Sequence, residues 1–189
     1  MHNQSSVAPG LLLAMPQLAD PNFHRSVVLM IEHHDGGSLG VVVNRPGNIP
    51  LAGLLELHEL EWKGPPEQRV GIGGPVMSGS RWMIHEPDPE LASAPRQGYM
   101  VLTDDIAVST STDMLERLAC EPPAHFLFLM GYAGWGRGQL AEEIEQGSWL
   151  HATATPELVF ETAPDRMWEA AMRSIGVDPV AVNRSSGLN

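Results

Sequence analysis

Glycine and proline interrupt this chain so often that turns and loops must be plentiful. The 189 residues include 19 glycines and 16 prolines, nearly one residue in five. Glycine lets the backbone turn tightly and proline removes a backbone donor, so both tend to end helices and strands. At this length we expect one domain, large enough to fold without a disulfide or a metal ion.

Short apolar runs between these interruptions predict strands, and amphipathic runs predict helices. We expect strands at residues 11–15, 27–33, 40–44, 70–73, 81–85, 99–103, 125–130, 149–154 and 158–160. We expect helices at residues 51–60, 113–120, 139–146 and 164–175. The two kinds of element are mixed with no boundary between them, so the fold class is α/β. We predict a single-domain α/β sandwich over residues 1–182, with a mixed, largely antiparallel sheet flanked by short helices, and a flexible C-terminal tail over residues 183–189.

The turn Asp35-Gly36-Gly37 separates two of these strands and predicts a β-hairpin. The second strand of the hairpin, residues 40–44, contains three consecutive valines. A continuous apolar run, unlike an alternating one, indicates a strand that is covered on both faces. We therefore expect both faces of this strand to be buried.

The charge balance argues against direct contact with nucleic acid. The chain has 11 basic and 23 acidic residues, which gives a formal net charge of −12, and its arginines are spread singly. Proteins gain affinity for DNA by neutralising several phosphates with clustered basic side chains. The predicted helices also include no pair three or four residues apart, as a helix-turn-helix requires.

The glycine-rich segments do not predict a nucleotide site. The only lysine, Lys63, precedes Gly64-Pro65, so the chain has no Gly-Lys-Ser/Thr phosphate loop. Residues 136–141 fit the Gly-x-Gly-x-x-Ala pattern of dinucleotide-binding folds. However, residues 131–135 separate this pattern from the preceding predicted strand, and the tight turn of that fold has no room for them. We expect a turn whose glycines let the backbone pass a neighbouring element, and we predict no cofactor.

The chain also has no convincing nucleophile or metal motif. Ser78 lacks the first glycine of a nucleophile elbow. Cys120 can in principle pair with His125, but it falls at a predicted helix C-terminus, whose negative dipole end disfavours a thiolate. His33 and His34 are consecutive at a strand end, so they point to opposite faces and do not readily share one ion. We therefore predict no catalytic residue and no metal site.

Cys120 is the only cysteine, which fits a reducing compartment. We expect it to be an inert, buried thiol in a monomer or, if it is exposed, the site of an interchain disulfide on oxidation. The N-terminal sequence lacks the basic residues and the long apolar run of a secretory signal, and no apolar run is long enough for a membrane span. These features predict a cytoplasmic protein without membrane contact.

Residues 131–140, Gly-Tyr-Ala-Gly-Trp-Gly-Arg-Gly-Gln-Leu, combine two aromatic residues with four glycines. One interpretation is structural, with Trp135 anchoring a loop in the core. The other is a shallow groove with an aromatic floor that binds a peptide or a ligand. The glycines beside Trp135 leave few side chains to cover it, so we expect it to border the functional surface.

Ordered motifs along residues 10–182 resemble those of the AlgH/YqgE family of small bacterial proteins. The motifs are Gly-Leu-Leu-Leu-Ala at residues 10–14 followed by Pro16, Phe23 with Arg-Ser-Val-Val at 25–28, Asn-Arg-Pro at 44–46, Gly-Gly-Pro-Val at 73–76, Ile-His at 84–85, Thr-Asp-Asp-Ile at 103–106, residues 131–140 with Glu-Ile at 143–144, Trp149, and Leu-Val-Phe at 158–160 with Trp168. The resemblance implies an α/β sandwich and a role in regulation, such as that of alginate production. It supplies no catalytic residues.

The leading hypothesis is a regulatory interaction protein that acts indirectly on gene expression through a protein or peptide partner. It predicts a shallow apolar cleft built from residues 73–76 and 131–140, and the alternative is an enzyme or small-molecule sensor that uses the same cleft. The predicted cleft residues are Pro16, Phe23, Arg25, Asn44, Gly73, Gly74, Pro75, His85, Gly131, Gly134, Trp135 and Gln139.

Overall fold

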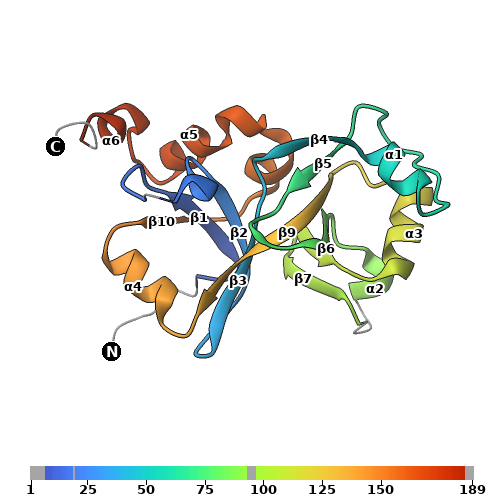
Figure 1. Cartoon of the computed structure of the whole chain (residues 1–189), viewed down its shortest axis with the longest axis horizontal. Helices are drawn as coiled ribbons and strands as arrows, with labels where there is room; N and C mark the ends of the chain where they lie inside the picture. Colours follow the sequence, from blue (N-terminus) through green and yellow to red (C-terminus); the bar gives the residue numbers. More distant parts are fainter. Residues whose placement is uncertain (1–6, 19, 93–96, 186–189) are drawn as a thin grey trace.

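The computed structural model describes residues 7–18, 20–92 and 97–185, in which ten strands form one curved sheet with short helices around it (Figure 1). The strands are β1 (Gly10–Ala14), β2 (Val27–His34), β3 (Gly37–Val42), β4 (Pro46–Pro50), β5 (Arg69–Ile72), β6 (Val76–His85), β7 (Tyr99–Thr103), β8 (Ile106–Ser109), β9 (Phe126–Gly136) and β10 (Trp149–Ala152). The helices are η1 (Pro21–Phe23), α1 (Leu51–Glu56), α2 (Pro89–Ala92), α3 (Thr112–Cys120), α4 (Gln139–Glu145), η2 (Glu157–Glu161), α5 (Pro164–Ser174) and α6 (Pro179–Ser185).

The order of strands in the sheet is β10-β1-β2-β3-β9-β6-β8-β7, and β5 joins β9 to β4. The pairing of β5 with β9 is parallel, and the other strand pairs of the described residues are antiparallel. This confirms the predicted fold class, an α/β protein with a mixed, largely antiparallel sheet.

Strand β9 belongs to both halves of the molecule. Its last residues, from Ala133 to Gly136, pair with β3. Its first residues, from Phe126 to Met130, pair with β6, and Phe128–Met130 also pair with β5. Figure 1 shows α4, α5 and α6 in the half that contains β1 and β10, and α1, α2 and α3 in the half that contains β6 and β7. The two halves are therefore joined through one continuous strand.

Three apolar clusters fill the space between the sheet and its helices. The largest packs against α5 and η2 and includes residues from strands of both halves. A second packs against α1 and α3, and a third packs against α4. Val41 and Val43 belong to the first cluster, whereas Val42 belongs to the third. The prediction that the valine run is covered on both faces is confirmed.

Glycines let two backbone segments cross in direct contact at the middle of β9. The Gly73 N–H donates to the Met130 carbonyl (2.7 Å), and the Gly73 carbonyl accepts from the Val42 N–H (2.8 Å). A Cβ at Gly74 would lie 2.2 Å from the Tyr132 backbone, and one at Gly131 would lie 2.4 Å from the Gly74 oxygen. Both glycines also have positive φ angles, +152° and +78°. This contact, called the glycine crossing below, excludes any side chain at these positions.

The structure corrects several expected elements. Residues 158–160 form part of the π-helical turn η2, not a strand, because the Thr162 N–H donates back to the Glu157 carbonyl (2.9 Å). Strands β4 and β8 are additional, and β9 continues through the glycines to Gly136 instead of ending at Met130. The segment expected to be a tail begins inside α6, which ends at Ser185.

Helices α5 and α6 are separated by residues 175–178 only, so the expectation that no two helices lie so close in sequence is wrong. The apolar face of α5, with Met167, Trp168 and Ala171, is buried in the core.

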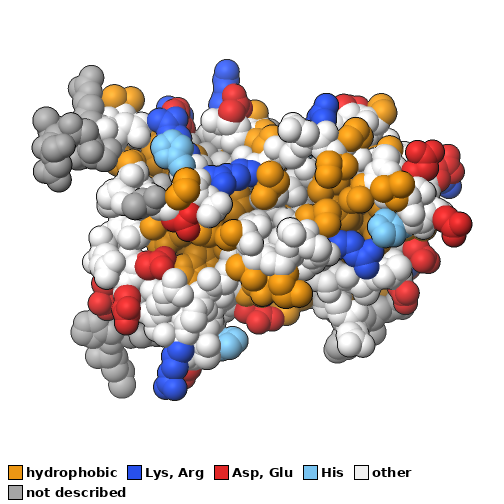
Figure 2. All heavy atoms as spheres, viewed as in Figure 1, with side chains coloured by type: hydrophobic (Ala, Val, Ile, Leu, Met, Phe, Trp, Pro, Cys, Tyr) orange, Lys and Arg blue, Asp and Glu red, His pale blue; other side chains and the backbone are white. Residues whose placement is uncertain are grey.

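On the face seen in Figure 2, Lys and Arg side chains are scattered singly, and carboxylates gather at the end near α1 and α3. Within the described parts of the chain, no helix is both long and apolar enough to span a membrane.

We expect Gly74→Ala to lower the free energy of unfolding by at least about 3 kcal/mol, because it adds a backbone clash to an unfavourable φ angle. Gly138→Ala is the matched control. Its φ angle is also positive, at +76°, but nothing lies within 4 Å of its added Cβ. The control should cost only about 1–2 kcal/mol. Denaturant unfolding measures both, and equal losses in the two variants would contradict the crossing.

Candidate functional site

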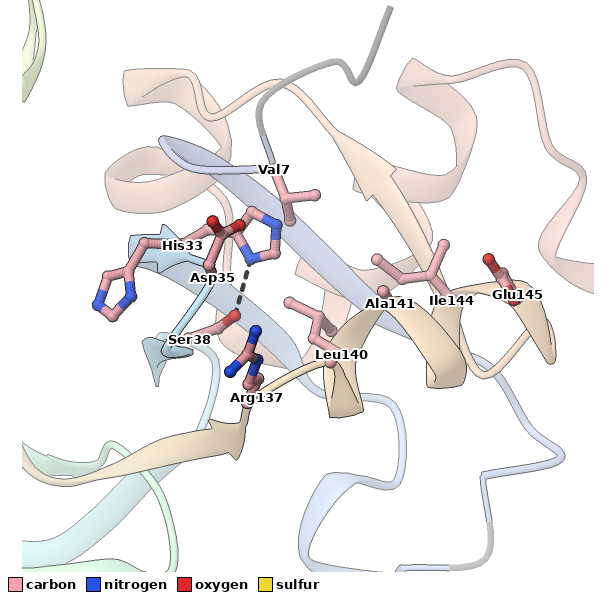
Figure 3. Close-up of a pocket in the computed structure, with 11 residues that line it drawn as sticks. Val7, His33, Asp35, Ser38, Arg137, Leu140, Ala141, Ile144 and Glu145 are labelled. Atoms are coloured by element: carbon pink, nitrogen blue, oxygen red, sulfur yellow. Dashed lines mark hydrogen bonds between the residues drawn. The ribbon is translucent and has the colours of Figure 1, made fainter. Parts of the chain in front are cut away.

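A hollow of about 670 Å³ lies between helix α4 and the tip of the β2–β3 hairpin (Figure 3). This volume is in the usual range for ligand pockets. Aliphatic lining side chains come from α4 and the N-terminal segment, and polar ones come from the hairpin tip and from the two ends of α4. The lining residues are Val7, His33, His34, Asp35, Ser38, Arg137, Gly138, Leu140, Ala141, Ile144 and Glu145.

Local sequence explains why α4 starts where it does. Gly138, with φ +76°, turns the chain out of β9. The Gln139 side chain then reaches back, and its Oε1 accepts the Gly136 N–H (3.0 Å). Leu140 and Ile144 follow at helical spacing, so both face the sheet, Leu140 fully buried and Ile144 half-buried. The helix therefore offers the hollow an aliphatic wall.

The Glu143 carboxylate fixes α4 to the sheet. Its Oε2 accepts the indole N–H groups of Trp135 on β9 (3.0 Å) and of Trp149 on β10 (2.7 Å). Its Oε1 accepts from the Gln139 amide one turn earlier (2.9 Å). The two indole bonds join the helix to the sheet, and the Gln139 bond, which lies within the helix, orients the carboxylate. Sequence reasoning missed this role, although Gln139 and Glu143 have the spacing of neighbours on one helix face.

The opposite wall is the tip of the hairpin. His33 and Ser38 are partners in the β2–β3 ladder, and the imidazole Nδ1 lies 2.7 Å from the Ser38 Oγ. Figure 3 shows this pair on the strand side of the hollow, facing Leu140 and Arg137 of the other wall. The site can thus accept an apolar group between aliphatic side chains, with hydrogen-bonding groups at its edge. Among residues 7–18, 20–92 and 97–185, no group of three or more His, Cys, Asp or Glu is placed to hold a metal ion.

The structure divides the predicted cleft residues among separate places. Gly73, Gly74 and Gly131 belong to the glycine crossing, where backbone fills the space that a cleft would need. Pro75 and Gly134 are exposed, and Pro16 is half-buried. Residues 73–76 therefore do not form a cleft with residues 131–140. Of the second segment, only Arg137, Gly138 and Leu140 line the hollow, and Gln139 does not.

Trp135 is only 6% exposed, so the expectation that its glycine neighbours leave it uncovered is wrong. Side chains distant in sequence cover it. Phe23 stacks on its ring at 6.4 Å between centroids, and the Trp149 ring meets it edge-on at 5.6 Å. Trp135 is a core residue that supports α4, which is the structural interpretation.

His85 is buried as well and does not line a shared cleft. Its Nδ1–H donates to the Glu86 carbonyl (2.7 Å), which leaves Nε2 to accept from the Ser109 hydroxyl (2.7 Å). Burial lowers the pKa of His85, against smaller opposing effects of the Glu86 carbonyl and of the Asp88 and Glu86 carboxylates.

Of the remaining predicted residues, Arg25 and Asn44 line a cavity together on another face. Cys120 is exposed, so it is not the buried thiol expected; its interchain disulfide stays a prediction.

Comparison with known proteins gives matches along nearly the whole chain. A family model described as AlgH-like matches residues 11–180. A UPF0301 protein of Myxococcus xanthus is 41% identical over 185 residues, which cover 97% of this chain and 99% of the relative. The solution structure of the AlgH protein from Pseudomonas aeruginosa has a TM-score of 0.75 at 31% identity, with 97% and 96% of the two chains covered. A crystal structure of a protein from Corynebacterium diphtheriae has a TM-score of 0.71 at 27% identity, with 88% and 86% covered.

We expect Trp135→Ala to lower the free energy of unfolding by about 3–5 kcal/mol, through lost burial and the cavity left behind. Trp135→Phe keeps an aromatic ring but loses the donor to Glu143, so it should cost about 1–2 kcal/mol. Denaturant unfolding gives both values. A loss below about 1 kcal/mol for the alanine variant would mean that the ring does not support the core.

Acid should destabilise the protein partly through His85. The folded state resists protonation because the imidazole is buried, whereas the unfolded chain takes up a proton near the ordinary pKa of 6.5. Stability is therefore lost as the pH falls below that value, by at most about 1.4 kcal/mol per pH unit for this one group. Unfolding at about pH 7 and about pH 5 should show a smaller acid loss in His85→Gln than in the wild type. Equal acid losses would contradict this role.

Proposed function

The chain belongs to the AlgH-like family, and we propose that it is an interaction protein. In this proposal a short apolar segment of a partner protein binds in the hollow between α4 and the β2–β3 hairpin. Any effect on gene expression then passes through that partner, in keeping with the net charge of −12 and the scattered arginines.

The observation that carries the proposal is the chemistry of the hollow. One wall presents Ala141 and Ile144, above the buried Leu140, from a helix that Glu143 fixes in place. A preformed aliphatic wall binds an apolar side chain at low entropic cost, because little has to be ordered on binding. The polar edge, with Asp35 and Arg137 of opposite charge, suits the backbone and flanking residues of a peptide.

A second candidate function is favoured by one observation only. The His33 imidazole and the Ser38 hydroxyl are 2.7 Å apart on the wall of the hollow, the geometry in which a histidine activates a serine nucleophile. Such a base is normally oriented by a third group. Within the described residues, the other ring nitrogen of His33 has no hydrogen-bonded partner. Labelling with a fluorophosphonate decides between the two: a binding protein leaves Ser38 unmodified, and a serine hydrolase is labelled there.

Ala141→Glu tests the binding proposal. Ala141 is exposed on α4 and lines the hollow, so glutamate leaves the fold intact but places a carboxylate against the apolar group of the partner. Peptides selected on the wild-type protein from a displayed random library should contain an apolar anchor, and the variant should bind them at least about ten-fold more weakly.

The control is Glu142→Gln, a neighbouring exposed residue of α4 that does not line the hollow. It should bind the selected peptides like the wild type, and circular dichroism should be unchanged in both variants. The proposal fails if the library yields no binder, or if Ala141→Glu binds the selected peptides as tightly as the control does.

A further inference from the structure

A second, smaller cavity of about 210 Å³ lies beside the start of α5. One wall comes from the loop before β2 and the loop after β3, which contribute Arg25, Asn44 and Arg45. The other wall comes from α5, which contributes Asp165, Trp168 and Glu169. This cavity and the hollow beside α4 share no lining residue. Its ligand is therefore independent of the proposed function.

The loop wall is built to hold Arg25 in an unusual conformation. Arg25 has φ +51°, a left-handed backbone that non-glycine residues adopt rarely. Asn44 stabilises it from both sides: its amide donates to the Arg25 carbonyl (2.9 Å), and its Oδ1 accepts the Val27 N–H (2.8 Å). Strained residues persist only where the surroundings fix them in this way, and they cluster at binding sites. The result is that the Arg25 guanidinium lies over the Trp168 ring, 5.3 Å from its centroid.

Arg45 adds a second fixed cation to the same wall. Its guanidinium donates to the His24 carbonyl (3.3 Å) and lies within 3.5 Å of the Pro21 carbonyl. It is half-buried, and burial lowers its pKa although the Asp20 carboxylate acts in the opposite direction. The loop wall thus carries two guanidinium groups held by backbone contacts and by an indole ring.

The helix wall carries the opposite charge. Asp165, Trp168 and Glu169 have i, i+3 and i+4 spacing, so they share one face of α5. Glu169 pairs along the helix with Arg173 (3.0 Å). In the described part of the chain, no ion pair within 4.0 Å joins Asp165 or Glu169 to Arg25 or Arg45. Cations and carboxylates therefore face one another across the cavity without closing it.

We propose that this cavity binds a free α-amino acid. Its carboxylate pairs with the guanidinium groups of the loop wall, and its ammonium pairs with the carboxylates of α5. The buried Trp168 ring lies beneath Arg25 at the base of the cavity. The small cavity volume, about 210 Å³, suits a small ligand. The two acidic residues disfavour a simple anion such as phosphate, and the two arginines disfavour a metal cation.

The test uses the full chain and the proteinogenic amino acids, added one at a time at up to ~10 mM. Two-dimensional NMR of the labelled protein should show saturable shifts at the Arg25 and Asn44 amides and the Trp168 indole for at least one amino acid. The N-acetyl form of that amino acid lacks the ammonium, and the amide form lacks the carboxylate. Each should bind at least about ten-fold more weakly. The proposal is overturned if no amino acid causes saturable shifts, or if both derivatives bind as tightly as the free amino acid.

Variants locate the binding. Arg25→Gly removes the guanidinium at a position where the positive φ angle suits glycine, so the fold is retained. Asp165→Asn removes one charge from the helix wall. Both should weaken binding at least about ten-fold, whereas Arg166→Gln, an exposed residue of the same helix outside the cavity, should leave it unchanged. If Arg25→Gly and Asp165→Asn bind the amino acid as tightly as Arg166→Gln, the site is wrong.

Discussion

The glycine crossing is the contact on which the rest of the structure depends. Here Gly73, which follows β5, is hydrogen-bonded to Met130 of β9 and to Val42 at the end of β3, so one residue ties three strands of the sheet together. Gly74 and Gly131 bring the two backbones closer than any side chain allows. Strand β9 can therefore continue straight from the β6 half into the β3 half. A residue with a side chain at this point would force the two halves apart.

The crossing also decides where function can lie. It fills with backbone the place where residues 73–76 and 131–140 were expected to form a cleft, and none of its glycines lines either cavity. On one side, Glu143 clamps α4 to Trp135 and Trp149 and creates the hollow next to the hairpin. On another face, α5 closes over Arg25 and Asn44. Each cavity has one wall from the sheet or its loops and one wall from a helix. A polar side chain fixes one wall of each: Glu143 bonds two indoles beside the hollow, and Asn44 bonds the backbone beside the smaller cavity.

Local signals in the sequence predicted much of the fold. The hairpin around Gly36 followed from its turn residues, and the burial of the valine run, residues 41–43, on both faces of the sheet followed from its unbroken apolar sequence. Helix α3 begins one residue before the expected start at 113, and the Ser111 hydroxyl caps it by accepting the Met114 N–H. Strand β4 escaped prediction because prolines stand at both its ends, and β8 was missed as well.

The functional sites were predicted less well, for a physical reason. Glycines near Trp135 indicate an exposed loop only if nothing else packs there, and what covers the ring is Phe23 and Trp149, which are distant in sequence. Likewise, Arg25 and Asn44 were identified as polar lining residues, but their partners on α5 come from a segment more than a hundred residues later. Contacts between such distant segments arise from topology, and no local pattern records them.

Native-state hydrogen exchange tests the central claim that the crossing makes the two halves one cooperative unit. We predict that the Val42 and Gly73 amides exchange only by global unfolding, with the same opening free energy as the Leu12 amide in one half and the Ile84 amide in the other. A distinctly lower opening free energy throughout β1 and β2 than throughout β6 and β8 would show that the halves unfold separately, and would contradict the account.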